Sequence, residues 1–226
     1  MTALIAGIVP PPAAVSEVFG DLPDASLFPE EEAVVARAIE KRRLEFTTSR
    51  ACARAALAKL GVPPAPILQG PRRAPQWPPG VVGSITHCAG YRASAVAFDR
   101  DVVTIGIDAE PHERLPPGVR EAVAFGAELT MLDALAARSP DIFWDRILFC
   151  AKEAVYKAWF PLTHRWLGFE EACVEFDPPA RTFTARLRVE GPMVNGAELT
   201  CFEGRWRVSN NLIATSIVVP LQPAPP

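Results

Sequence analysis

The chain has few of the residues that build zinc clusters, disulfide frameworks or histidine-rich metal sites. Its 226 residues include five cysteines and three histidines. The cysteines are widely spaced with no Cys-x-x-Cys, which argues against a zinc cluster or a dense disulfide framework and predicts buried, reduced thiols. A Gly-x-Ser-x-Gly segment is also absent, and no acid is placed to orient His87 toward Ser84. A protease-like serine site is therefore discounted.

Strong net charge and long apolar stretches are missing as well. The formal net charge of −3 gives no global attraction to nucleic acid or to anionic membranes. No segment approaches the length of a membrane span, and the N-terminus lacks the charged start and long apolar core of a signal peptide. We therefore expect a cytoplasmic protein that binds neither nucleic acid nor membranes, in which any recognition of phosphate must come from local clusters of arginine and lysine. We also expect a monomer.

Proline, by contrast, is abundant, and its clusters separate two similar runs of secondary structure. The 24 prolines gather in loops and in the tail 223–226, which is expected to be frayed. A helix over 30–60, with a break near Thr47 and an end at Gly61, precedes an antiparallel meander of strands at 81–86, 93–98 and 102–107.

The second run repeats this order. Helices near 121–137 and 144–159, the latter followed by a loop, precede strands near 172–176, 182–189, 205–208 and 212–219, with a hairpin turn at Asn210 and Asn211. The pattern predicts an α+β fold of two halves, 1–103 and 104–226, in one compact unit.

The most informative residues are two carboxylates that follow a strand. The apolar run 102–107 leads into Asp108 and Glu110, and Pro111 ends the strand. Alternate strand residues share a face, where two carboxylates repel unless a cation or a proton lies between them. Such oxygen ligands suit Mg²⁺, which also binds substrate phosphates. The alternative is a pair of solvated carboxylates, because this spacing is common.

Glu153 lies on the unexpected face of the 144–159 helix. Apolar residues recur there at the spacing expected for burial, and Glu153 falls on the opposite side. That side also carries aromatic and basic residues, which are Arg146, Phe149, Tyr156, Lys157 and Phe160. A mixed aromatic and charged face is typical of a cleft wall, whereas the alternative is a solvated Glu153–Lys157 pair one turn apart.

Together these segments resemble the Sfp-type 4′-phosphopantetheinyl transferase family. Its Gly-Ile-Asp-x-Glu motif corresponds to 106–110, and its Trp/Phe-x-x-Lys-Glu-(Ala/Ser)-x-x-Lys motif corresponds to 149–157. Gly-Ser-Ile-Thr-His-Cys at 83–88 resembles a third motif, and the basic segment 41–50 resembles the enterobactin-synthetase-like branch. Within that branch, 63–68 and 157–163 resemble the actinobacterial PptT-like group.

The resemblance implies a pseudo-twofold pair of α/β halves with coenzyme A in the cleft between them. It implies that Mg²⁺, or alternatively Mn²⁺, is held by Asp108, Glu110 and Glu153. Contacts to coenzyme A are implied for Arg42, Arg50, Thr86, His87, Asp108, Lys152, Tyr156, Lys157 and Trp166. By residue type alone, the arginines also fit a solvated helix face, His87 an ordinary strand histidine, and the two aromatics a core.

One position departs from the PptT-like group. A lysine precedes the Gly70 turn in that group, whereas this chain has Gln69. Arg72 and Arg73 follow closely, and either could replace the missing charge.

The function that the resemblance implies is transfer of 4′-phosphopantetheine from coenzyme A to a serine of apo acyl, peptidyl or aryl carrier proteins, with release of 3′,5′-ADP. Glu153, directly or through a metal-bound water, would take the serine proton, and Lys157, with Lys152, would stabilise the developing negative charge. Service to fatty-acid, polyketide and nonribosomal peptide pathways would follow. The alternatives are a Mg²⁺-dependent phosphohydrolase acting on a nucleotide or a diphosphate like that of coenzyme A, and a non-catalytic binding module.

Overall fold

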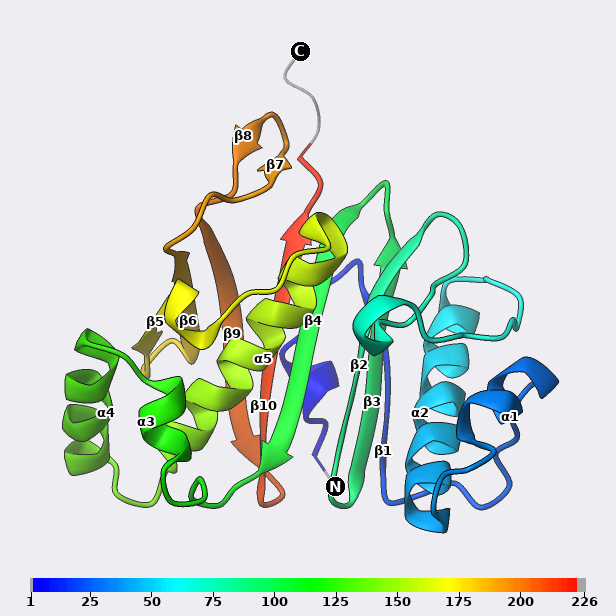
Figure 1. Ribbon diagram of the computed structural model, residues 1–226, viewed down its shortest axis with the longest axis horizontal. Coiled ribbons are helices and arrows are strands. Elements are labelled where there is room, and N and C mark those ends of the chain that lie inside the picture. Colours follow the sequence, from blue (N-terminus) through cyan, green and yellow to red (C-terminus); the bar gives the residue numbers. More distant parts are fainter. Residues whose placement is uncertain (1, 223–226) are drawn as a thin grey trace.

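The computed structural model describes residues 2–222, so the tail 223–226 lies outside the described residues (Figure 1). Helices and antiparallel strands occur in both halves of the chain, which confirms the predicted α+β class. The pseudo-twofold relation of the halves stays a prediction. Within residues 2–222, no helix is both long and apolar enough to cross a membrane.

The N-terminal part forms a three-stranded antiparallel sheet backed by a long helix. The strand order is β1 (Ala14–Phe19), β3 (Tyr91–Phe98), β2 (Val81–Cys88). Helix α2 (Glu40–Lys59) packs on β3 and β1, and the short helix α1 (Pro29–Val35) lies outside it, at the right of Figure 1. This sheet and α2 form one wall of the cleft described below.

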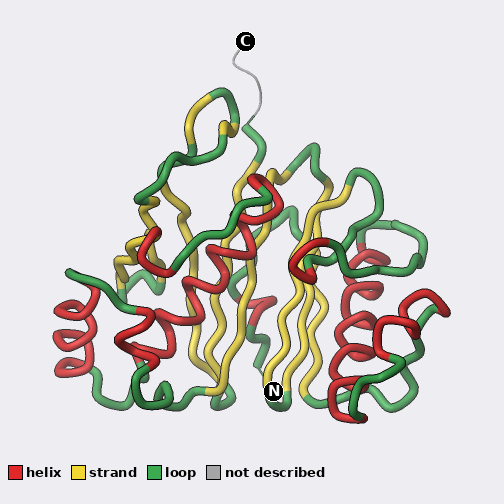
Figure 2. Tube along the Cα trace, viewed as in Figure 1, coloured by secondary structure: helices red, strands yellow, loops and turns green. Residues whose placement is uncertain are grey.

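The C-terminal part forms a five-stranded antiparallel sheet crossed by helix α5 (Trp144–Thr163). Figure 2 shows the strands in the middle of the molecule, with α1 and α2 on one side and α3 (Val119–Val123) and α4 (Ala127–Arg138) on the other. The sheet order is β4 (Val102–Pro111), β10 (Leu212–Pro220), β9 (Cys201–Ser209), β6 (Thr182–Leu187), β5 (Ala172–Asp177). A small hairpin of β7 (Met193–Val194) and β8 (Ala197–Glu198) projects at the top of Figure 1.

The two sheets meet along β2 and β4 through side chains. The backbone N–H of Ile107 donates to Ser84 Oγ at 3.1 Å, and that of Ala109 donates to Thr86 Oγ1 at 3.0 Å. All four residues are buried. We call this hydroxyl-bonded junction the seam. The predicted meander is therefore wrong at its third strand, because β4 leaves β3 and pairs with β10, a strand buried to a similar depth.

The back of the seam is covered by the beginning of the chain. Leu4, Ile5 and Ile8, around the short turn η1 (Ile5–Gly7), join the apolar cluster formed by β3, β4 and β10. Ser216 Oγ donates to the carbonyl of Ile8 at 3.0 Å, which fixes this segment to the last strand. Residues at opposite ends of the sequence thus support the strand that carries the acidic motif.

Several boundaries differ from the sequence prediction. The 30–60 helix breaks at 36–39 instead of near Thr47, whose hydroxyl donates to a carbonyl one turn earlier and leaves the residue helical. The 121–137 helix is two helices, separated where Gly126 adopts a φ of +55°. The loop expected after Trp159 begins only at His164, because α5 continues past Pro161, whose missing N–H removes only one bond from the last turn. Strand β1 was not predicted.

Other elements follow the prediction closely. The strands expected near 172–176 and 212–219 are β5 and β10. Asn210 and Asn211 connect β9 to β10 with positive φ angles of 53° and 58°, as a tight hairpin turn requires. Gly106 of the acidic motif has a packing role, since a Cβ there would lie 2.0 Å from the carbonyl oxygen of Ala154 on α5. This close approach sets the distance between β4 and α5, and hence between their carboxylates.

Candidate active site

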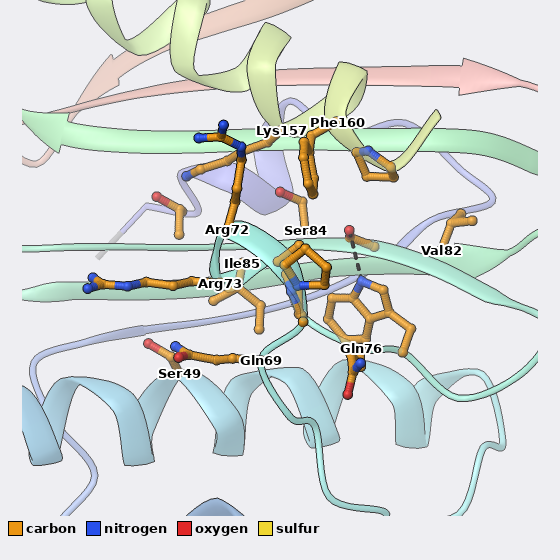
Figure 3. Close-up of a pocket in the computed structure, with 18 of the residues that line it drawn as sticks. Ser49, Gln69, Arg72, Arg73, Gln76, Val82, Ser84, Ile85, Lys157 and Phe160 are labelled. Atoms are coloured by element: carbon orange, nitrogen blue, oxygen red, sulfur yellow. Dashed lines mark hydrogen bonds between the residues drawn. The ribbon is translucent and has the colours of Figure 1, made fainter. Parts of the chain in front are cut away.

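A cavity of about 690 Å³ lies between the two halves of the chain (Figure 3). Helix α2 supplies one wall with Arg42, Phe46 and Arg50, and the other wall comes from α5. Strand β2 forms the floor, and the loop 69–77, with its short turn η2 (Pro71–Arg73), reaches over it. The α5 residues that line the cavity are Glu153, Tyr156, Lys157, Phe160 and Pro161. The mixed face predicted for this helix is thus largely the face that the cavity exposes.

Asp108 is buried on β4, where only one of its two oxygens is bonded. Its Oδ1 accepts hydrogen bonds from Lys157 Nζ at 2.7 Å and from Thr86 Oγ1 at 3.1 Å. Thr86 thereby joins the seam to the acidic motif, since the same hydroxyl accepts from Ala109. Asp108 Oδ2 is buried and has no partner among the described residues. A buried carboxylate oxygen without a donor is costly, so this atom is suited to a cation.

Glu110 is held by an arginine. Its Oε2 accepts from Arg146 Nη1 at 3.0 Å, while Arg146 also donates to the backbone carbonyls of Glu113 and Arg114. Burial, followed by the charge of Asp108, raises the pKa of Glu110 to about 7, although Arg146 opposes the change. The predicted interpretation as a pair of fully solvated carboxylates does not fit this geometry.

Glu153 and Lys157 face the same region from α5. The Glu153 carboxylate has no hydrogen-bond or ion-pair partner within residues 2–222, and burial and the charge of Asp108 raise its pKa. Burial would lower the pKa of Lys157, but the Asp108 carboxylate holds it above its usual value. Lys157 Nζ also donates to the carbonyl of Ile107 at 3.1 Å. An ammonium has three N–H groups, so one remains for a ligand.

The structure does not bring Lys152 to the main cavity. Its ammonium donates to Glu128 Oε2 at 2.8 Å, to the carbonyl of Val123 at 2.8 Å and to that of Phe169 at 2.7 Å, which uses all three N–H groups. Glu128 also accepts the N–H groups of Phe125 and Val174. Sequence reasoning missed Glu128, because nothing in the spacing of 24 residues marks it as the partner of Lys152.

The side of the cavity formed by α2 and the end of β2 is basic. Arg42 Nη1 lies 2.9 Å from His87 Nε2, and Glu45 is within 4.0 Å of His87 Nδ1. Burial, followed by the charge of Arg42, lowers the pKa of His87 to about 4, so the ring is neutral at pH 7. Arg50 donates its Nε proton to the carbonyl of Ile67 at 2.7 Å; burial lowers its pKa to about 10, which leaves it cationic.

The loop 69–77 brings two arginines over the cavity. Arg72 lies 5.0 Å above the ring of Trp166, which belongs to the C-terminal half. The side chain of Arg73 has no hydrogen bond, ion pair or aromatic contact among the described residues. Figure 3 shows Arg72 turned toward α5 and Arg73 extended along β2, in the direction from Val82 toward Ile85. That direction leads toward Thr86 and His87, at the end of the strand.

A smaller cavity of about 190 Å³ adjoins the first and shares Glu153 and Tyr156 with it. Its remaining wall includes Trp166, Leu167 and Phe169. The Tyr156 and Trp166 rings lie 5.0 Å apart, and the Tyr156 hydroxyl is buried without a hydrogen-bond partner in residues 2–222. Trp166 is 61% exposed, so it is not the core aromatic that its residue type alone suggested.

The three carboxylates of Asp108, Glu110 and Glu153 fit a divalent cation in part. Asp108 Oδ2 is orphaned, and Asp108 raises the pKa of both Glu110 and Glu153, as expected for carboxylates close enough to repel. Across residues 2–222, however, no three acidic, cysteine or histidine side chains are gathered into a preformed metal cluster. Lys157 and Arg146 instead supply the positive charge at Asp108 and Glu110.

Comparison with known proteins shows to which family this chain belongs. Residues 30–97 match the model of the 4′-phosphopantetheinyl transferase N-terminal domain, and residues 104–206 match that of the 4′-phosphopantetheinyl transferase superfamily. The 4′-phosphopantetheinyl transferase Svp of Streptomyces mobaraensis is 54% identical over 96% of this chain and 89% of its own length. PptT of Mycobacterium tuberculosis is 47% identical over 96% and 98%, and Npt of Nocardia iowensis is 46% identical over 95% and 99%.

The chain therefore belongs to the 4′-phosphopantetheinyl transferase superfamily, whose enzymes transfer phosphopantetheine from coenzyme A to carrier proteins. The predicted family and its PptT-like branch are confirmed. The phosphohydrolase alternative is not favoured, because the relatives that match nearly the whole chain are all named as transferases.

Proposed function

We propose that this enzyme moves the 4′-phosphopantetheine group of coenzyme A to a serine of apo acyl, peptidyl or aryl carrier proteins and releases 3′,5′-ADP. The observation that carries the proposal is one cavity with a basic side at Arg42 and His87 and an acidic side at Glu153, whose neighbour Lys157 bonds Asp108. Coenzyme A has the matching layout, with a 3′-phosphate and a diphosphate on one molecule. We also propose that 1–103 and 104–226 are the two halves that enclose it.

The basic side of the cavity, formed by Arg42, Arg50 and His87, would hold the nucleotide. Arg42 and Arg50 are cations on the cavity wall, and guanidinium groups suit bidentate phosphate binding. His87 is neutral without ligand, and a phosphate beside it would raise its pKa by favouring the charged form. Of the two arginines near Gln69, we propose that Arg73 supplies the missing charge, because Arg72 is engaged with Trp166.

The three carboxylates of Asp108, Glu110 and Glu153 are the candidate ligands of a Mg²⁺ or Mn²⁺ ion, which would hold the diphosphate. When bound, the ion would neutralise the diphosphate and orient it for in-line attack. Lys157 would donate its free N–H to a phosphate oxygen, where it stabilises the negative charge that develops during transfer. Lys152 is left out of this set, because its three donors are already bonded.

The chemical step needs a base and a nucleophile. The nucleophile is the carrier serine, whose oxygen forms a bond to the β-phosphorus as the bond to the bridging oxygen of 3′,5′-ADP breaks. Glu153 would accept the serine proton, since its carboxylate faces the cavity without a partner and its raised pKa makes it a stronger base than an ordinary glutamate. Tyr156 and Trp166 would wall the pantetheine arm, because both line the smaller cavity.

The test is an adduct assay. The protein is incubated with coenzyme A, Mg²⁺ and a purified apo carrier protein, and the carrier is examined by mass spectrometry. We expect phosphopantetheine on the carrier serine, its loss with chelator or with Glu153→Gln, and its retention with Glu175→Gln, an exposed glutamate on β5. Absence of adduct on several competent carriers would refute the proposal, and release of nucleotide without any carrier would indicate a hydrolase.

A further inference from the structure

A contact between Arg72 and Trp166 links the loop 69–77 of one half to the segment that follows α5 in the other. The Arg72 guanidinium carbon lies 5.0 Å from the centre of the Trp166 ring, within the range of a cation–π interaction. Arg72 also lines the larger cavity, whereas Trp166 lines the smaller one. The contact therefore joins a residue of one cavity to a residue of the other, and the two cavities share Tyr156 and Glu153.

The loop that carries Arg72 is held in a demanding conformation. Arg72 and Arg73 both have positive φ angles, 52° and 64°, which are unfavourable for residues other than glycine. The turn keeps them because its base is closed by hydrogen bonds from Gly70 N to the carbonyl of Ala74 at 2.8 Å and from Gln76 N to that of Leu68 at 2.9 Å. Strain of this kind persists where the surroundings fix it, and here it aims Arg72 across the cleft.

Trp166 projects from a segment that is tied down on both sides. The carbonyl of Arg165 accepts a hydrogen bond from Trp159 Nε1 at 3.1 Å, and Leu167 is buried. The ring of Trp166 lies between, 61% exposed, with Tyr156 5.0 Å away. Its neighbours fix the backbone, so the orientation of the ring depends on Tyr156 and Arg72.

We propose that Arg72 and Trp166 form a clasp that positions the Trp166 ring as the wall of the smaller cavity, before coenzyme A arrives. The assignment of that cavity to the pantetheine arm rests on the proposed function. An exposed cation–π contact favours the ordered ring by about two- to fivefold, equivalent to about 0.5–1 kcal/mol. A ligand that packs against an ordered ring avoids that cost of ordering.

The clasp itself is tested without substrate. Acrylamide quenching of tryptophan fluorescence reports mainly on Trp166, because Trp144, Trp159 and Trp206 are buried and Trp77 is half-buried. Trp166→Phe supplies the background. We expect Arg72→Gln to change the quenching of Trp166, and Arg73→Gln, the matched control on the same turn and with the same backbone conformation, to leave it unchanged. Unchanged quenching in Arg72→Gln would overturn the proposal.

Binding then separates positioning from simple charge. Isothermal titration with coenzyme A and with 3′,5′-ADP, which lacks the pantetheine arm, gives two affinities for each variant. We expect Arg72→Gln to weaken the binding of coenzyme A by two- to fivefold and the binding of 3′,5′-ADP by much less. Arg73→Gln should weaken the binding of both ligands equally. Trp166→Ala should lower the affinity for coenzyme A by the same factor as Arg72→Gln. The double variant of Arg72→Gln and Trp166→Ala should bind coenzyme A no more weakly than either single variant. Equal losses for both ligands in Arg72→Gln, or additive losses in the double variant, would refute the clasp. If no variant and no parent protein binds coenzyme A, the proposed function fails while quenching still decides the clasp.

Discussion

Replacing Lys152 by methionine should unfold the protein more readily without removing a hydrogen-bond donor that is free to bind substrate. The side chains of Lys152 and Glu128 are 2% and 1% exposed, so the variant would leave a buried carboxylate with only two backbone N–H donors. Two backbone carbonyls, of Val123 and Phe169, would also lose their donor. Breaking a buried pair by removing one partner costs about 3–5 kcal/mol.

At that cost, the melting temperature of a domain of this size should fall by roughly 6–20 °C. Urea denaturation of Lys152→Met is the assay, with Lys41→Met, an exposed lysine on α2, as the control. A decisive partner is the double variant Lys152→Met with Glu128→Leu, because replacing both members of a buried pair by apolar residues is often neutral. It should regain part of the lost stability, because no unpaired buried charge remains although four backbone groups lose their side-chain partners, and it should still form the carrier adduct.

Two results would refute this reasoning. A loss in Lys152→Met below about 1 kcal/mol would mean that the buried pair does not hold α5 to its neighbours. A stable double variant that no longer binds coenzyme A would restore Lys152 to the ligand contacts that the sequence motif suggested. The same experiment therefore decides between the architectural role seen in the structure and the direct role expected from the sequence.

Two further predictions concern β4. Gly106→Ala should destabilise the protein by about 3 kcal/mol, because the new Cβ would lie 2.0 Å from the Ala154 carbonyl; an unchanged denaturation midpoint would show that α5 can move away. Glu110, whose pKa of about 7 is raised above its ordinary 4.5, stabilises the metal-free fold below pH 4.5, and this stabilisation is lost as the pH rises through 7. Because a metal must displace the Glu110 proton, the Mg²⁺ concentration needed for thermal stabilisation should rise by up to about tenfold for each pH unit below pH 7. A Mg²⁺ concentration that stays the same from pH 5 to 8 would argue against Glu110 as a ligand.

The features that the sequence predicted well are local ones. The strand segments of β5 and β10, the Asn210–Asn211 turn and the buried stripe of α5 depend on neighbouring residues, so they could be recognised without knowing the fold. The unusual face around Glu153 could be recognised for the same reason. The roles of the individual site residues, the cytoplasmic location and the monomeric state stay predictions.

The features that sequence reasoning missed depend on distant partners. Strand β4 pairs with β10, about a hundred residues later, although β3 precedes it directly. Lys152 belongs to a charged pair with Glu128, and Arg146 holds Glu110, through contacts that only the tertiary fold creates. One signal was available: Ser84 and Thr86 are alternate residues of one strand, so two hydroxyls on one buried face could have indicated a side-chain junction.

The seam between β2 and β4 has a consequence for how this enzyme can vary. Hydrogen bonds between the backbones of two strands form whatever the side chains are. Here, instead, the hydroxyls of Ser84 and Thr86 accept two backbone N–H groups of β4. The hydrogen bonds that attach β2 to β4 are thus encoded in two side chains, which act beside the apolar cluster of β3, β4 and β10. Single substitutions at these positions can loosen the joint while leaving every strand intact, so the width of the cleft is a property that selection or a protein engineer can adjust one residue at a time.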